Sequence, residues 1–88
     1  MQNIAKKEWE KQVHAALQMT RSFTKDEQYY HLSKWYEVGF DIETIKLAYS
    51  YLLRKNGSWD WHTMTLVLGW IRRCGVAEFK LDSENLES

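Results

Sequence analysis

The stretch WDWHTMTLVLGWIRRCG, from Trp59 to Gly75, decides the fold of this chain. Apolar residues three or four apart form a ridge through it, and other apolar side chains occupy much of the remaining circumference. This pattern is typical of an α-helix that packs on several sides, so we expect the central helix of the domain here. Ser58 or Asp60 can cap its start, and Gly75 can end it. The expected inner ridge consists of Trp59, His62, Leu66 and Trp70.

Three further helices are expected before this stretch, over residues 3–19, 24–38 and 42–55. Each carries apolar residues at helical spacing, and a glycine follows the second and the third, where a left-handed backbone can end a helix. A Thr-x-x-Glu capping box opens the second helix at Thr24, and Asp41 is the expected N-cap of the third. The side chains expected to face the core are Trp9, Val13, Ala16, Leu17, Tyr29, Leu32, Trp35, Tyr36, Ile45, Ala48, Tyr49 and Leu52.

The last residues of the chain differ in charge from the rest. Residues 1–76 are expected to form one helical domain with a net charge of +3, and residues 77–88 an acidic C-terminal tail with a net charge of −3. The segment around Phe79 is expected to hold one short turn, so it is either a short fifth helix or a frayed tail. The sequence therefore predicts an all-α fold, a compact bundle of four main helices.

Composition excludes several classes of protein. The chain has 88 residues, enough for one small domain, and its 44% hydrophobic content is ordinary for a globular protein. Its one cysteine, Cys74, excludes an internal disulfide scaffold, and no apolar run is long enough to span a membrane. The first residues are polar and lack the apolar stretch of a secretion signal, so we expect a cytoplasmic protein.

No pattern in the sequence indicates a metal site or an active site. The three histidines, His14, His31 and His62, lack the spacing of a metal-binding motif, so no metal or other cofactor is expected. Ser58 and Asp60 lie near His62 in the sequence, but a catalytic triad is set by three-dimensional geometry and not by adjacency. There is also no glycine-rich phosphate loop, and we expect that the chain is not an enzyme.

Three short segments carry a resemblance to a known family. They are WYEVGF at residues 35–40, IKLAY at residues 45–49, and Leu66-Val67-x-x-Trp70 followed by Gly75-Val76. In this order and spacing they resemble the DnaD-like domain, the C-terminal module of bacterial and phage replication-initiation proteins, over roughly residues 23–76. The family's Tyr-x-x-x-Ile-x-x-x-Trp motif falls on His62, Leu66 and Trp70, so that a histidine stands where the family has tyrosine.

The resemblance implies a role in assembling the replication machinery. Members of this family are not enzymes; they bind DNA without strong sequence preference and help to recruit the replicative helicase through its loader. For this chain the resemblance implies weak, largely sequence-independent binding of single- or double-stranded DNA in primosome assembly. It also implies replication proteins, such as a helicase loader or an initiator, as partners.

Basic and aromatic residues near two helix ends are the candidates for such a DNA site. Arginine and lysine there can contact phosphates, although the helix dipole favours cations at C-terminal ends whatever the ligand. Trp61 lies off the expected inner ridge, so we expect it to be exposed and able to stack on an unpaired base. The candidate nucleic-acid-binding residues are Arg54, Lys55, Trp61, His62, Arg72 and Arg73.

The alternative is a protein-interaction module with little direct contact to DNA. Its net charge of zero favours this reading, because domains that bind DNA strongly tend to be basic. Tyr30, Tyr51 and Trp61, if exposed together, would form an aromatic patch suited to an interface. A third reading is a helical unit that forms homo-oligomers. Clustering of the four bases at the two helix ends would favour DNA, and scattering would favour protein.

Overall fold

The computed structural model describes residues 5–17 and 25–87, and each regular element within these ranges is an α-helix. The all-α class is therefore confirmed for the described residues. Among them, none of the helices combines the length and the apolar character that a membrane span requires. In chain order the helices are α1 (Lys6–Ala16), α2 (Lys25–Val38), α3 (Ile42–Asn56), α4 (Trp61–Cys74) and α5 (Val76–Glu87).

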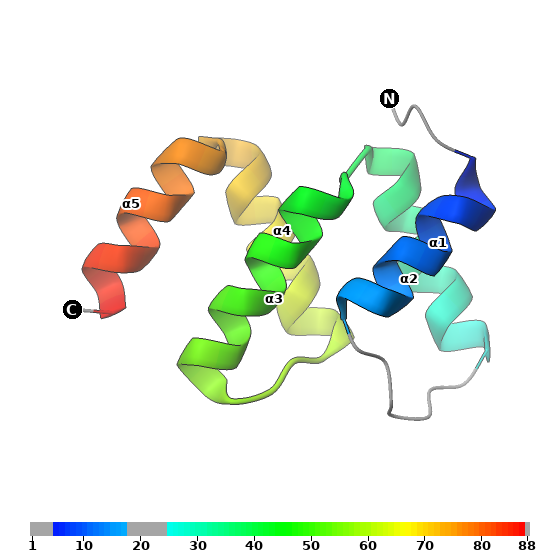
Figure 1. Ribbon diagram of the computed structural model, residues 1–88, viewed down its shortest axis with the longest axis horizontal. Helices are drawn as coiled ribbons and strands as arrows, with labels where there is room; N and C mark the ends of the chain where they lie inside the picture. Colours follow the sequence, from blue (N-terminus) through cyan, green and yellow to red (C-terminus); the bar gives the residue numbers. More distant parts are fainter. Residues whose placement is uncertain (1–4, 18–24, 88) are drawn as a thin grey trace.

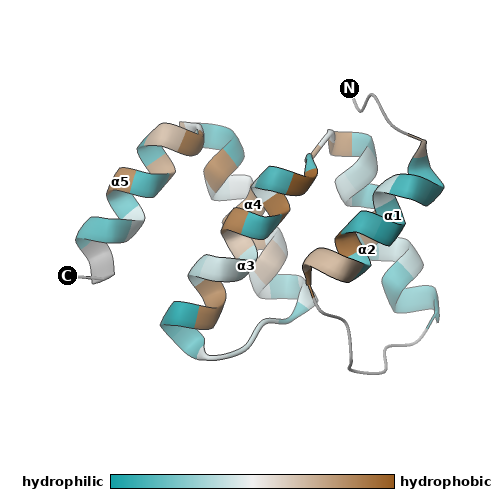
Figure 2. Ribbon diagram, viewed as in Figure 1, coloured by the Kyte–Doolittle hydropathy of each residue, from teal (hydrophilic) through white to brown (hydrophobic). Residues whose placement is uncertain are grey.

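Helix α3 occupies the centre of the molecule, where α4 was expected. It packs against α1 on one side and against α4 and α5 on the other, while α2 packs against α1 (Figure 1). The molecule measures 37 × 28 × 18 Å. In the shortest direction the helices form two layers, with α1 and α3 in front of α2 and α4 (Figure 1), so no helix is enclosed on all sides. Each helix consequently carries hydrophilic as well as apolar residues (Figure 2).

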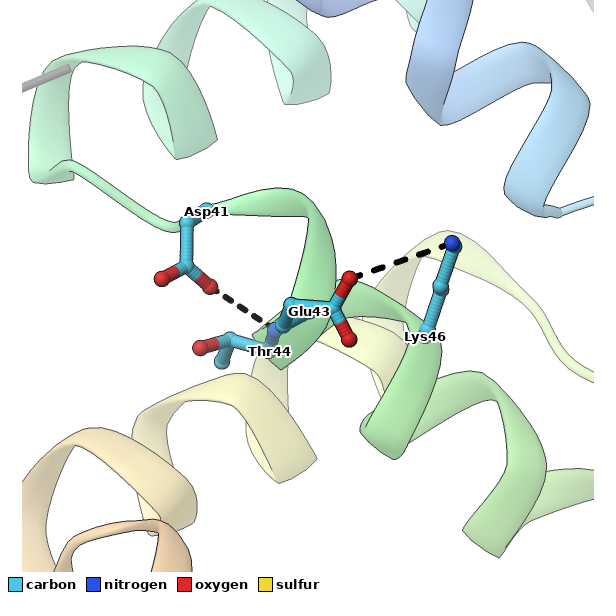
Figure 3. A network of polar contacts seen from close by, with 4 residues as sticks. All are labelled: Asp41, Glu43, Thr44 and Lys46. Atoms are coloured by element: carbon cyan, nitrogen blue, oxygen red, sulfur yellow. Dashed lines mark hydrogen bonds and ion pairs between the residues drawn. The ribbon is translucent and has the colours of Figure 1, made fainter. Parts of the chain in front are cut away.

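The start of α3 is capped as the sequence predicts. A carboxylate oxygen of Asp41 accepts a hydrogen bond of 2.8 Å from the backbone N–H of Thr44 (Figure 3). Next to this cap, Glu43 and Lys46 form an exposed ion pair with a nitrogen–oxygen distance of 3.9 Å. Such a pair contributes little to stability, because water and salt screen it. The cap is the stronger of the two contacts and fixes where α3 begins.

Helix α4 starts at a reciprocal cap formed by Asp60, which settles the choice between Asp60 and Ser58. The Asp60 carboxylate accepts from the backbone N–H of Thr63 at 2.8 Å, and the Thr63 hydroxyl accepts from the backbone N–H of Asp60 at 3.2 Å. The bond from the Thr63 N–H lowers the pKa of Asp60 below its ordinary value of 3.8. The capping box predicted at Thr24 lies outside the described residues.

The core contains most of the side chains that helical spacing places inside. The predictions for Trp9, Val13 and Leu17 are confirmed, as are those for Ile45, Ala48 and Leu52 of α3, whereas Tyr49 is half-buried. Tyr29 was also expected there, but its side chain is 68% exposed. The buried hydrophobic residues are Trp9, Val13, Leu17, Leu32, Trp35, Phe40, Ile45, Ala48, Tyr51, Leu52, Trp61, Met64, Val67, Leu68, Ile71 and Phe79.

The C-terminal segment, expected to hold one short turn, is a helix of 12 residues. Phe79 of α5 is fully buried, with its ring 4.7 Å from that of Trp70 and 5.5 Å from that of Tyr51. Tyr51 and Trp70 also meet edge to face, so that three rings from α3, α4 and α5 form one cluster. Ser83, one turn further along, is buried as well and extends the inner face of α5.

Candidate functional site

The predicted inner ridge of Trp59, His62, Leu66 and Trp70 is only partly inside the molecule. The side chain of Leu66 is 58% exposed, His62 is exposed, and Trp59 and Trp70 are half-buried. The prediction that this ridge faces the core is therefore wrong for His62 and Leu66, whereas Trp59 and Trp70 pack against the core. Helix α4 has apolar residues on two sides. The side that it buries consists of Trp61, Met64, Val67, Leu68 and Ile71.

Trp61, expected to be exposed and to stack on a base, is a core residue. Its ring lies parallel to that of His31 with 5.2 Å between centroids, 5.4 Å from the ring of Trp35 and 5.1 Å from that of Trp59. Only 4% of the residue is accessible. A ring enclosed in this way has no face for an unpaired base, so we exclude Trp61 from the DNA-binding candidates.

His31 joins α2 to this aromatic cluster. Its imidazole stacks on Trp61 at an interplanar angle of 2°. Burial lowers the pKa of His31 below its ordinary value of 6.5, Lys34 lowers it further, and the carboxylate of Glu27 opposes both. The folded state therefore favours the neutral imidazole in this position.

A groove of about 550 Å³ runs beside the exposed ridge of α4. Its wall includes the exposed side of Leu66, and Gly69 contributes no side chain to it. The guanidinium of Arg73 lies over Gly69, with one nitrogen 3.4 Å from the position that a Cβ would occupy there. The groove is thus mainly apolar with one cation at its end. Its lining residues are Tyr51, Thr65, Leu66, Val67, Gly69, Trp70 and Arg73.

The four predicted phosphate-binding residues do not form one cluster. Helices α3 and α4 run in opposite directions, so Arg54 and Lys55 at the end of α3 lie far from Arg72 and Arg73 at the end of α4 (Figure 1). All four are exposed. Arg72 lines a separate pocket of about 280 Å³ together with the turn between α2 and α3 and with Thr44 of α3. His62, at the start of α4, is separated from both arginines by most of that helix.

Two lysines that sequence reasoning missed come together between α3 and α5. Lys46 and Lys80 line a pocket of about 260 Å³, with Glu43 on its rim. Val76 lines both this pocket and the one next to Arg72. No signal in the sequence pairs these lysines, because they belong to separate helices that the fold brings together.

The histidines lie apart from one another. His14 is exposed on α1 and His62 on α4, while His31 is held against Trp61. Within residues 5–17 and 25–87, no three His, Cys, Asp or Glu side chains form a group able to hold a metal ion. Cys74 is half-buried at the end of α4, and its thiol contacts the carbonyl oxygen of Gly75 at 3.4 Å.

The predicted aromatic patch of Tyr30, Tyr51 and Trp61 is not formed. Tyr51 and Trp61 are buried in separate clusters, and only Tyr30 is exposed. Its neighbour Tyr29, predicted to be buried, is exposed beside it. The exposed aromatic surface of α2 therefore consists of two adjacent tyrosines.

No protein-family model, curated protein or solved structure matches this chain. The resemblance to the DnaD-like domain accordingly rests on the sequence motifs alone. Two of its three motif residues, His62 and Leu66, are exposed on α4, and the third, Trp70, is half-buried beside them.

Proposed function

We propose that this chain is a non-catalytic binding domain that docks a protein of the replication machinery on the exposed face of α4. The observation that carries the proposal is the exposure of Leu66 beside a mainly apolar groove of about 550 Å³. A large apolar side chain next to such a groove is a feature of interaction sites, because covering it removes apolar surface from water.

The groove supports a partner segment of defined chemistry. An amphipathic helix laid along α4 would place apolar side chains against Leu66 and the half-buried edge of Trp70. Arg73 at the end of the groove would then pair with a carboxylate of the partner, since its guanidinium can hold a carboxylate by two hydrogen bonds. The partner segment is therefore an apolar helix with an acidic residue near one end.

The proposal names replication proteins because of the resemblance to the DnaD-like motif. Its residues His62, Leu66 and Trp70 all belong to the face of α4 that we propose as the docking site. The partner classes that the resemblance implies are the replicative helicase, its loader and the initiator. Separation of the two pairs of basic residues favours a protein partner over DNA, because a DNA backbone is bound best by cations on one surface.

Direct DNA binding is the second candidate. It is supported by the exposed row of α4 on which His62, Leu66 and Arg73 follow one another at helical spacing. Such a row offers one flat ring and one cation, so the affinity would be low and would fall with added salt. Arg54 and Lys55 would require a second contact at the far end of the molecule.

The deciding experiment measures binding of the purified helicase, loader and initiator by isothermal titration calorimetry. We expect Leu66→Glu to weaken binding of one of them about tenfold or more, as for a buried interface residue. The matched control is Leu81→Glu on α5, where the leucine is 59% exposed but lies outside the groove. Equal binding by both variants, or binding of none of the three proteins, would overturn the proposal.

DNA titrations at low salt separate the second candidate from the first. If the chain acts mainly on DNA through this face, the unmodified chain binds a labelled oligonucleotide and none of the three proteins. Arg73→Glu then abolishes binding of the oligonucleotide. If docking to protein is its function, Arg73→Glu weakens the protein complex and Lys55→Glu leaves that complex unchanged.

A further inference from the structure

The exposed face of α4 is apolar in its middle and charged at its two ends. Leu66 lies near the middle of the helix, and its side chain is 58% exposed. The carboxylate of Asp60 caps the start of the helix, Arg73 lies in its last turn, and both residues are exposed. The hydrogen bond from Thr63 lowers the pKa of Asp60, so this carboxylate is ionised at neutral pH. The helix thus carries an anion, an exposed apolar side chain and a cation in that order.

This order of charges is complementary to itself when a second copy is turned end over end. A two-fold axis at Leu66 makes the two α4 helices antiparallel, and residues equally far from Leu66 on its two sides then come level with each other. Arg73 follows Leu66 by seven residues, and Asp60 precedes it by six. The cation of each copy therefore lies beside the start of the other copy's α4, where the carboxylate is.

The position of the Arg73 side chain fits this pairing. Its guanidinium lies over Gly69, which is three residues beyond Leu66. Thr63 is three residues before Leu66, and its backbone N–H donates a hydrogen bond of 2.8 Å to the Asp60 carboxylate. Because Gly69 of one copy comes level with Thr63 of the other, each guanidinium is already level with the carboxylate of the opposite copy.

The charges also favour this arrangement over other pairings of α4. A parallel pair would place the two Arg73 side chains next to each other, and like charges repel. An antiparallel pair instead opposes the two helix dipoles as well as the side-chain charges. The whole chain has 12 basic and 12 acidic residues, so its net charge does not keep two copies apart.

We propose that the chain pairs with a second copy of itself through antiparallel α4 helices. The two Leu66 side chains meet at the two-fold axis, and Arg73 of each copy pairs with Asp60 of the other. His62 and Trp70 are each four residues from Leu66, so these rings come level across the interface and add flat surface beside the leucines. Because both copies use the same patch, the assembly closes at two.

The pairing regulates the docking site on α4, a consequence that rests on the proposed function. Leu66 is covered in the pair, so a protein partner binds only the free chain. The apparent affinity for the partner therefore falls as the concentration of the chain rises above the dissociation constant of the pair. Self-pairing thus limits docking when the chain is abundant.

The first test is sedimentation equilibrium of the chain alone, at concentrations up to about 1 mM. We expect a reversible equilibrium between monomer and dimer. Leu66→Glu should weaken it about tenfold or more, and Leu81→Glu, at a leucine that is 59% exposed on α5, should leave it unchanged. Asp60→Asn keeps a cap but removes the charge, so it should weaken pairing about threefold or more. A monomer throughout, assemblies larger than two, or equal effects of the two glutamates would overturn the pairing.

A disulfide tests the position of the two-fold axis. Leu66→Cys, in a chain whose native thiol is removed by Cys74→Ser, should give a covalent dimer with oxidised glutathione. The reason is that two cysteines at the axis bring their Cβ atoms within disulfide range. Leu81→Cys in the same background is the control and should remain monomeric. Equal yields from the two variants would contradict the axis at Leu66, and circular dichroism checks that each variant is folded.

Failure of the pairing is distinguishable from failure of the proposed function. Asp60 does not line the groove, so Asp60→Asn should bind a protein partner at least as tightly as the unmodified chain in calorimetry. A chain that stays monomeric but loses its partner with Leu66→Glu overturns the pairing and leaves docking intact. A chain that pairs but binds none of the three replication proteins overturns docking and leaves the pairing intact.

Discussion

The indole N–H of Trp9 donates a hydrogen bond of 2.9 Å to the backbone carbonyl oxygen of Phe40. This bond joins α1 to the turn between α2 and α3, and both residues are buried. The turn itself depends on Gly39, whose φ of 99° lies in the region that favours glycine. Helix α1 has 11 residues, too few for a stable helix in isolation, so its position depends on contacts of this kind.

Replacing Trp9 by phenylalanine should destabilise the fold. The Trp9→Phe variant keeps an aromatic ring but removes the donor, and the buried carbonyl of Phe40 loses the hydrogen bond from Trp9. We expect the free energy of unfolding to fall by about 1–3 kcal/mol from that loss alone. Urea unfolding followed by circular dichroism measures it. Trp70→Phe, at a half-buried indole, is the control and should cost less; an equal cost would contradict this role of the hydrogen bond.

Leu66 and Leu68 provide a matched pair that tests which side of α4 is buried. Leu68 is fully buried, so Leu68→Ala should cost about 2–5 kcal/mol of unfolding free energy. Leu66→Ala should change stability by less than about 0.5 kcal/mol, as an exposed substitution does. The measurement is the thermal unfolding of both variants. The reverse order would show that the ridge predicted from the sequence is the inner one after all.

Replacement of Gly69 and of Gly75 by alanine should change the free energy of unfolding in opposite directions. Gly69 lies inside α4, where a Cβ would meet only the mobile end of Arg73, so Gly69→Ala should stabilise the chain by up to about 1 kcal/mol. Gly75 has φ 89° and ψ 158°, a conformation found almost only in glycine, so Gly75→Ala should cost about 1–3 kcal/mol. The urea midpoints of the two variants show whether each substitution stabilises or destabilises the chain. A more stable Gly75→Ala variant would contradict the backbone conformation described for Gly75 between α4 and α5.

Stability should rise with pH as His31 loses its proton. The pKa of His31 is lower in the folded chain than its ordinary value of 6.5, so the unfolded chain binds more protons between the two values. The contribution of the neutral His31 to the free energy of unfolding is complete above pH 6.5. It is lost as the pH falls from 6.5 through the lower pKa of the folded chain. Urea unfolding across this range measures the slope. His31→Gln should flatten it, whereas His14→Gln controls for loss of an imidazole elsewhere.

The cap at Asp60 should show a pH dependence of the same sign, at a lower pH. Its pKa is lowered by the hydrogen bond from Thr63, so the stabilisation is present above the ordinary value of 3.8 and is lost as the pH falls through the folded value. At neutral pH we expect Asp60→Ala to cost about 1 kcal/mol. Asp60→Asn, which can still accept the bond, should cost less at neutral pH, and a cost equal to that of alanine would argue against capping.

The sequence predicts the helices well and the faces of α4 poorly. Capping residues and glycines act locally, so the starts of α3 and α4 can be located without knowledge of the fold. Helix α4 instead presents apolar residues on two sides, with Trp61 on one and Leu66 on the other. Its own spacing cannot decide which side is buried, because that depends on where α3 and α5 lie.

The candidate site depended on the same undetermined geometry. Whether Arg54 and Arg72 lie together is set by the relative direction of α3 and α4, which local sequence does not encode. Tyr29 follows the spacing of the inner face of α2, yet its side chain is 68% exposed in the first half of that helix, with Lys6 over its ring. Sequence reasoning therefore placed Trp61 and Leu66 on the wrong sides of α4.

The shallow depth of 18 Å has a consequence for how a partner acts on this protein. The helices form two layers in this direction, and a helix added on the exposed side of α4 would enclose Leu66. Its binding free energy would then appear directly as resistance to heat, growing with partner concentration. Under the docking proposal, the isolated chain would be an incomplete bundle whose final layer comes from another molecule.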